Sequence, residues 1–137
     1  MESLKSNKKI VFLFNPPYAA SGNMGTKKGD TKGSICKTMI NKMMEDEDMG
    51  RVRENLLAQF LYRVMKIKEM FNLTNCVLAF FCNPIFMSGN SYNKFRNKLL
   101  NMFEYKDGYM FNASHFADCS DRWGISFSIW EIKDFQN

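Results

Sequence analysis

The sequence has few of the residues from which metal centres and disulfide frameworks are built. It contains four cysteines, of which the closest two, Cys76 and Cys82, are six positions apart, and a single histidine, His115. A structural zinc site needs closely spaced Cys or His ligands, so the sequence predicts no metal site. Because Cys76 and Cys82 lie in an apolar run, we expect free, buried thiols and a protein of the reducing cytoplasm.

Long apolar runs are also absent from the chain. The apolar stretch that follows the basic amino terminus extends only from Ile10 to Phe14. A transmembrane helix needs about 20 consecutive apolar residues, and a secretory signal needs a central apolar segment of about 7–15 residues. The sequence therefore predicts neither a membrane span nor a secretory signal.

The composition favours a single folded domain over residues 1–137. Hydrophobic residues make up 45% of the chain and aromatic residues 15%, which is enough to build one core. The formal net charge of +5 permits attraction to polyanions such as nucleic acids, although many soluble domains carry a similar excess. Charge alone therefore leaves the partner open.

Two unbroken apolar segments predict strands of a parallel sheet. Lys9–Phe14 and Asn75–Cys82 are rich in β-branched and aromatic residues, and an Asn-Pro pair follows each of them directly. Continuous apolar runs are typical of strands that are covered on both faces, and proline ends such a strand. We therefore expect both segments to be buried on both faces.

Apolar residues at helical spacing predict helices between and after these strands. We expect a short helix over Ile35–Met44, a long helix over Arg51–Phe71, and a third helix from a Ser91 cap to about Tyr105. The acidic run Glu45–Asp48 would stand at the amino terminus of the long helix, where the helix dipole favours negative charge. The glycine- and lysine-rich segment Ser21–Ser34 is predicted to be a surface loop.

The end of the chain has the pattern of an antiparallel strand pair. Gly108–Asn112 predicts a short strand, and Ile125–Ile132 alternates between apolar and polar residues as a strand does. The complete order predicts an α/β fold with two right-handed crossovers between parallel strands and an antiparallel end. Ligands of such sheets bind at the carboxyl ends of the strands, which is where Asn15 stands.

The residues Asn15-Pro16-Pro17-Tyr18 predict a rigid turn after the first strand. The two prolines fix the backbone φ angle and have no N–H group, so the turn presents oxygen acceptors at little entropic cost. Such acceptors suit the activation of an aromatic amine, whose lone pair is delocalised until hydrogen bonds draw the nitrogen towards tetrahedral geometry. A proline-stopped strand without a catalytic role is the alternative explanation of the same four residues.

With its surrounding order of strands and helices, from about Lys9 to Ile132, the motif resembles the catalytic half of S-adenosylmethionine-dependent DNA adenine amino-methyltransferases. The resemblance implies a partial Rossmann-like class I methyltransferase sheet, with parallel strands, crossover helices and an antiparallel carboxy-terminal hairpin. It also implies a catalytic site at Asn15, Pro16, Pro17 and Tyr18. The Asn15 and Pro16 oxygens would accept hydrogen bonds from the amine of a flipped-out adenine, and Tyr18 would stack on the base.

The resemblance also implies further contacts with the substrate. A second aromatic side chain often comes from the segment before the last strand, where Phe116 and Trp123 are the candidates. Lys27, Lys28 and Lys32 lie in the loop after the motif and are candidates for holding phosphates or the unstacked DNA strand. A solvated loop without such contacts is an equal alternative for these three lysines.

S-adenosyl-L-methionine is the cofactor that the resemblance implies, but its binding residues are not apparent. The family holds it at a glycine-rich turn and an acidic residue on earlier strands, and neither precedes Asn15. The loop glycines Gly22, Gly25, Gly29 and Gly33 follow the wrong strand and have the wrong spacing. We therefore expect an amino-terminal half or a separate subunit to supply most cofactor contacts, and the chain alone to be inactive.

The expected partners are DNA and, through the outer edge of the first strand, a second polypeptide. An edge strand without a neighbour is free to pair, so the sequence predicts self-association. A restriction–modification or phage system is the expected setting. The rival functions are a same-fold methyltransferase acting on RNA or on a protein glutamine, and a non-catalytic nucleic-acid-binding or assembly module that has kept the fold.

Overall fold

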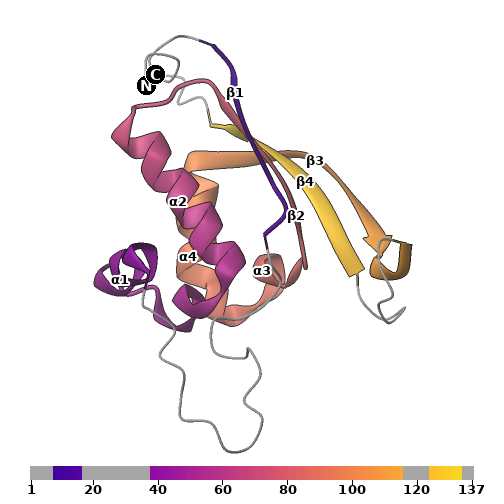
Figure 1. Ribbon diagram of the computed structural model, residues 1–137, viewed down its shortest axis with the longest axis horizontal. Coiled ribbons are helices and arrows are strands. Elements are labelled where there is room, and N and C mark those ends of the chain that lie inside the picture. Colours follow the sequence, from indigo (N-terminus) through magenta and orange to yellow (C-terminus); the bar gives the residue numbers. More distant parts are fainter. Residues whose placement is uncertain (1–7, 17–37, 116–123, 134–137) are drawn as a thin grey trace, which may run out of the picture.

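A computed structural model describes residues 8–16, 38–115 and 124–133. In this part of the chain, four strands form one mixed sheet, and the helices form a layer beside it (Figure 1). The elements in chain order are β1 (Ile10–Phe14), α1 (Met39–Asp46), η2 (Gly50–Glu54), α2 (Leu56–Met70), β2 (Cys76–Cys82), α3 (Ile85–Ser88), η3 (Asn90–Tyr92), α4 (Asn93–Met102), β3 (Phe103–Asn112), η4 (Ala113–His115) and β4 (Gly124–Ile132).

The four strands are arranged in the order β1-β2-β4-β3. β1 and β2 are parallel, whereas β4 is antiparallel to both of its neighbours. The α/β class, the first parallel pair and the antiparallel hairpin are therefore as expected. The expected second parallel pairing is wrong: β3 runs in the direction of β2, but β4 lies between them. Side chains of β4 alternate between the two faces of the sheet, and Ser128 and Trp130 are buried on the same face as Phe80 and Leu78 of β2. This burial explains the central place of β4 in the sheet.

One face of the sheet forms the core together with the helices. Leu78 and Phe80 of β2 and Trp130 of β4 are at most 1% exposed and belong to one buried cluster with Leu61 of α2 and Leu99 of α4. Figure 1 shows α1, α2 and α4 gathered on one side of the strands. The Trp130 indole N–H donates to the Ser128 hydroxyl at 3.0 Å, so the largest core side chain has its polar atom satisfied.

The opposite face of the sheet is largely apolar, with the Lys9–Glu131 ion pair at one end, and among the described residues it carries no helix. The side chains of Val11 and Leu13 on β1 point to it and are 58% and 66% exposed. The expectation that β1 is buried on both faces is therefore wrong, whereas β2 is buried at every position except the half-buried Phe81. β2 is buried because it lies between two strands, β1 and β4, whereas β1 lies at the edge of the sheet.

The acidic run was expected to begin the long helix. Instead, it lies at the end of the helix before it. Residues 45 and 46 close α1, and Glu47 is its carboxy-terminal cap. Asp48 and Gly50 then have positive φ angles of 54° and 64°, which end the helix before η2. The expected single helix over Arg51–Phe71 is divided as a result, and α2 begins only after Asn55, whose side chain caps the Ala58 N–H.

Other boundaries differ by up to five residues. Ser91 lies inside η3, and no side-chain hydrogen bond caps α4. α4 ends at Met102 because β3 begins at Phe103, five residues earlier than the expected strand start at Gly108. Within the described ranges, no helix is long and apolar enough to cross a bilayer.

Candidate functional site

The candidate site lies at the carboxyl end of the parallel pair, where Asn15 and Pro16 follow β1. The Phe14 ring stacks on Phe80 of β2 with centroids 5.4 Å apart and planes inclined by 6°, and Phe60 of α2 lies 6.1 Å away. Asn15 is exposed, whereas the Pro16 side chain is less than 2% exposed. The end of the strand is thus anchored by Phe14 and Pro16, with Asn15 held between them at the surface.

A second Asn-Pro pair ends β2 at the same edge of the sheet. The Asn83 amide oxygen accepts a hydrogen bond from the Ile85 backbone N–H at 3.0 Å and so starts α3. At the end of the same strand, the Ser126 hydroxyl donates to the Cys82 carbonyl at 3.1 Å and ties β4 to β2. Asn83 therefore has a structural role in its turn, which makes it a useful comparison for Asn15.

An aromatic cluster lies beside Asn15 on the open face of the sheet. The register pairs Phe14 with Phe80, so the next residues along the two strands are Asn15 and Phe81. The Phe81 ring lies 4.7 Å from Phe127 and 6.1 Å from Phe111, measured between centroids. Sequence patterns did not identify this cluster, because its members come from three different strands.

The loop end of the β3–β4 hairpin reaches the same edge of the sheet. β4 is antiparallel to β2, and its first residues lie at the carboxyl end of β2, with Ser126 paired to Cys82. Asn112 at the end of β3 pairs with Gly124 at the start of β4. Strands are about 4.8 Å apart, so the start of β4 lies roughly 10 Å across the sheet from the line of β1.

Most of the expected site residues lie outside the described part of the chain. These are Pro17 and Tyr18 of the motif, the lysines of the following loop, and the two aromatic candidates between the last strands: Pro17, Tyr18, Lys27, Lys28, Lys32, Phe116 and Trp123. Of the expected catalytic residues, the structure describes Asn15 and Pro16. It also brings the hairpin end from which the Phe116–Trp123 segment extends to their edge of the sheet.

The described strand ends do not fit a cofactor of the dinucleotide-like kind. Such ligands need glycines and backbone N–H groups after a parallel strand, but β1 and β2 are followed by Pro16 and Pro84, which have no N–H to donate. A hollow of about 170 Å³ is lined by residues that include Pro84, Phe86, Tyr105 and Trp130. It is smaller than the roughly 300–1,000 Å³ of typical ligand pockets. In the described segments, no group of three or more His, Cys, Asp or Glu is placed to hold a metal ion.

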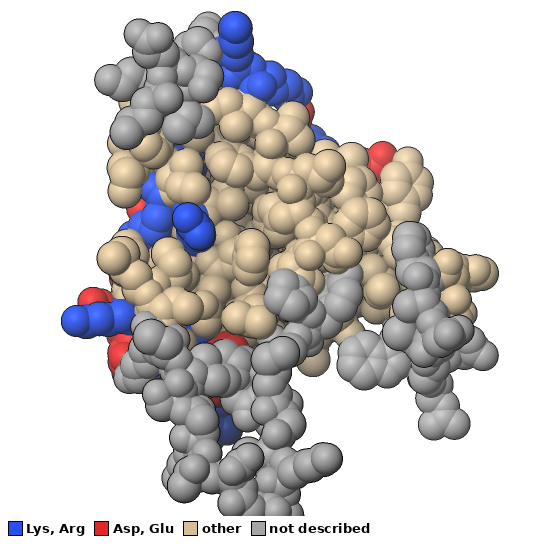
Figure 2. Space-filling model, viewed as in Figure 1, with Lys and Arg blue, Asp and Glu red and all other residues tan. Residues whose placement is uncertain are grey.

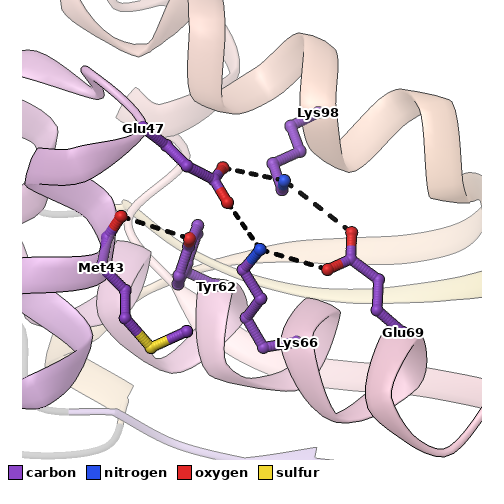
Figure 3. A network of polar contacts seen from close by, with 6 residues as sticks. All are labelled: Met43, Glu47, Tyr62, Lys66, Glu69 and Lys98. Carbon is purple, nitrogen blue, oxygen red and sulfur yellow. Dashed lines mark hydrogen bonds and ion pairs between the residues drawn. The ribbon is translucent and has the colours of Figure 1, made fainter.

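A network of charged side chains joins the helices away from the strand ends (Figure 3). The Glu47 carboxylate at the end of α1 contacts the Lys66 ammonium of α2 at 2.5 Å and the Lys98 ammonium of α4 at 2.9 Å. Glu69 contacts the same two ammonium groups at 3.2 and 3.8 Å. Two carboxylates thus balance two ammonium groups, and the network connects three helices.

The ionisation of this network follows from its surroundings. Burial alone would raise the pKa of Glu47, but hydrogen bonds from Lys66, Lys98 and Tyr62 outweigh it and lower this pKa to about 2. Burial and the hydrogen bond to the Glu47 carboxylate raise the pKa of Tyr62 to about 12, and the Met43 carbonyl oxygen lies 3.5 Å from the Tyr62 hydroxyl oxygen. Glu47 is therefore ionised at neutral pH, and its hydrogen bond likewise raises the pKa of Lys66 above its ordinary value.

Comparisons with protein-family models, with curated proteins and with solved structures found no match for this chain.

Proposed function

We propose that this chain is the catalytic portion of a larger or split methyltransferase that acts on the exocyclic amine of a flipped-out adenine in DNA. The observation that supports the proposal is the position of Asn15: exposed, directly after a strand of a parallel pair, and followed by a buried Pro16. A side-chain amide in this place offers an oxygen acceptor at the edge where α/β sheets bind ligands.

The proposed role of Asn15 and Pro16 concerns the amine alone. A hydrogen bond from the amine to the Asn15 side-chain oxygen would draw the nitrogen towards tetrahedral geometry and make its lone pair available. The other acceptor that the resemblance implies, the Pro16 carbonyl, belongs to a residue that is less than 2% exposed. No charged base is needed, because the nitrogen becomes acidic once it has been alkylated. The anchoring of the turn by Phe14 and Pro16 supports this role, since acceptors that are held in place need little reorganisation.

S-adenosyl-L-methionine is the methyl donor in this proposal, and its binding residues come from another polypeptide segment or a second subunit. Two observations favour this division: prolines rather than glycines follow the two parallel strands, and the open face of the sheet is largely apolar. Parallel strands are ordinarily covered on both faces, so a further layer would complete the fold.

The proposal is tested by measuring the binding of duplex oligonucleotides that contain one unpaired adenine or one unpaired thymine. We expect the chain to prefer the unpaired adenine by about tenfold. The flipping cost of a few kcal/mol is already met in both duplexes, and only adenine presents an exocyclic amine to the Asn15 oxygen. Asn15→Ala should remove the preference and leave general, salt-dependent binding unchanged.

The matched control is Asn83→Ala, which changes the other Asn-Pro pair of the same sheet edge. The Asn83 oxygen is used by the Ile85 N–H, so this variant should keep the adenine preference. Equal binding of unpaired adenine and thymine by the unaltered chain would contradict the proposal. A preference for the matching RNA would favour the RNA-modifying alternative, and binding without base preference would favour a non-catalytic module.

A second measurement concerns the division of the enzyme. Incubation of the purified chain with labelled S-adenosyl-L-methionine and DNA should give no methyl incorporation, because the described strand ends offer no site for the donor. Robust incorporation by the chain alone would show that it holds the donor itself.

A further inference from the structure

The sheet has two edge strands, β1 and β3, and only β3 has features that oppose pairing with another strand. β3 contains Glu104, Lys106 and Asp107, and its register shifts between Tyr105 and Asp107 in the manner of a β-bulge. Charged residues and bulges are the usual protection of an exposed edge. β1 is the uncharged sequence Ile-Val-Phe-Leu-Phe with a regular register.

The backbone of β1 offers hydrogen-bonding groups on its outer side. The Ile10 N–H donates to the Asn75 carbonyl at 3.0 Å, and the parallel register then directs the N–H and C=O groups of Ile10, Phe12 and Phe14 towards β2. The groups of Val11 and Leu13 point away from β2, and no described strand lies on that side. The edge is therefore open to a further strand.

Apolar side chains flank this edge on both faces of the sheet. Val11 and Leu13 are 58% and 66% exposed on the open face, and Phe60 of α2 is 44% exposed beside Phe14 on the helical face. In the common view of Figures 1 and 2, β1 lies in front of the other strands. The surface over its middle and lower part is tan, whereas basic side chains lie at its upper end. A strand that pairs with β1 would therefore meet apolar groups above and below.

We propose that β1 pairs with β1 of a second copy of this chain, antiparallel about a twofold axis through Phe12. In this register Val11 of one copy faces Leu13 of the other, and each such pair exchanges two backbone hydrogen bonds. Ile10 faces Phe14 of the partner copy, and the two Phe12 residues face each other. Apolar residues thus oppose apolar residues along the whole strand, and each strand presents the same surface, as a twofold interface requires.

Charge selects this arrangement over the alternatives. In the antiparallel register Lys9 stands opposite Asn15, beyond the ends of the apolar pairs. In a parallel arrangement Lys8 and Lys9 would face the same residues of the second copy, and like charges directly opposite each other destabilise a strand pair. A shift of the antiparallel register by one pair would place Lys9 opposite Leu13 or Asn15 opposite Val11. This inference depends on the edge of β1 and not on the proposed methyl transfer.

The first test is the oligomeric state of the purified chain, measured by sedimentation over a range of concentrations. The unaltered chain should form a dimer, and Leu13→Lys should weaken the association by about tenfold or more, because lysine on an edge strand opposes pairing. Tyr109→Lys is the matched control: Tyr109 is 62% exposed on the same open face, but it belongs to β3. It should leave the dimer unchanged.

Two outcomes of this test would overturn the proposal. One is a monomer at every concentration of the unaltered chain. The other is an equal loss of association in Tyr109→Lys and Leu13→Lys, which would assign the interaction to the open face rather than to the β1 edge. Far-UV circular dichroism and the melting temperature of each variant check that it is folded.

The second test examines the register by disulfide formation between introduced cysteines. Cys76 and Cys82 are buried, and the other two cysteines of the chain, Cys36 and Cys119, are replaced by serine so that they cannot form competing disulfides. Val11 of one copy should face Leu13 of the other, so a mixture of the Val11→Cys and Leu13→Cys chains should form a cross-linked heterodimer under mild oxidation. Residues that face each other in a strand pair are within the Cα separation that a disulfide can bridge. Efficient cross-linking of either variant with itself, in place of the mixture, would show a different register and refute the proposal.

Discussion

Replacing Glu47 by glutamine should destabilise the protein at neutral pH, because Glu47 is the acidic centre that joins α1 to Lys66 and Lys98 (Figure 3). The variant keeps the size of the side chain but removes its charge. The two ammonium groups would then be balanced by Glu69 alone, which lies 3.2 and 3.8 Å from them. The change therefore tests the charge of the network and not the packing around it.

The expected magnitude follows from the pKa of Glu47. A fall from the ordinary value of 4.5 to about 2 corresponds to about 3 kcal/mol of folding stability at neutral pH. The side chain is 32% exposed, so solvent screening reduces the expected contribution to about 1–2 kcal/mol. The pKa of Glu47 is lower in the folded than in the unfolded chain. The stabilisation is therefore fully present above pH 4.5 and is lost as the pH falls towards 2.

Urea denaturation of both proteins, measured at several pH values between 7 and 2.5, provides the assay. The free energies of unfolding should differ by about 1–2 kcal/mol at pH 7, and the difference should shrink steadily below pH 4.5. Glu104→Gln is the control, because Glu104 contacts Lys106 at a more exposed site and should contribute less than about 1 kcal/mol. A difference between Glu47→Gln and the unaltered protein that stays constant down to pH 2.5 would refute the electrostatic explanation.

Three further predictions concern the core, a helix cap and the thiols. Trp130→Ala should lower the free energy of unfolding by about 3–5 kcal/mol in urea denaturation, since Trp130 is 1% exposed; a loss below about 1 kcal/mol would contradict its central place. Asn55→Ala should cost about 1 kcal/mol in the same assay because it removes the cap of the Ala58 N–H, and Asn55→Asp should retain most of the stability. Burial raises the pKa of Cys76 and Cys82 to about 11, so a thiol reagent at pH 8 should modify these two cysteines only after unfolding. Mass spectrometry follows the labelling, and rapid labelling of Cys76 or Cys82 in the native protein would be inconsistent with their burial.

The strands and the long helix were predictable because their signals are local. The apolar runs before Asn15 and Asn83 and the alternation before Ile132 identify β1, β2 and β4 within one or two residues. The placement of Asn15 at the end of a strand was predictable for the same reason, because proline stops a strand wherever the rest of the chain goes. The apolar stripe of α2 has the spacing of a helix and needs no distant partner to be recognised.

Errors arose where a distant contact determines the local structure. Glu47 was expected to begin a helix by its charge, but it ends one, because Lys98 lies 51 residues further along the chain and stabilises it there. β1 was expected to be buried on both faces by its composition, but exposure depends on which strands become its neighbours. The aromatic cluster of Phe81, Phe111 and Phe127 could not be predicted for the same reason, since strand register brings it together.

By itself, the sequence determined where most of the strands and helices lie and that Asn15 and Pro16 directly follow the first strand, since these properties depend on neighbours within a few residues. Only the tertiary structure decided that β4 lies between β2 and β3 and that one face of the sheet carries no described helix. These features depend on pairing between segments far apart in the chain, and hydrogen bonding and burial select such pairs for the whole fold at once.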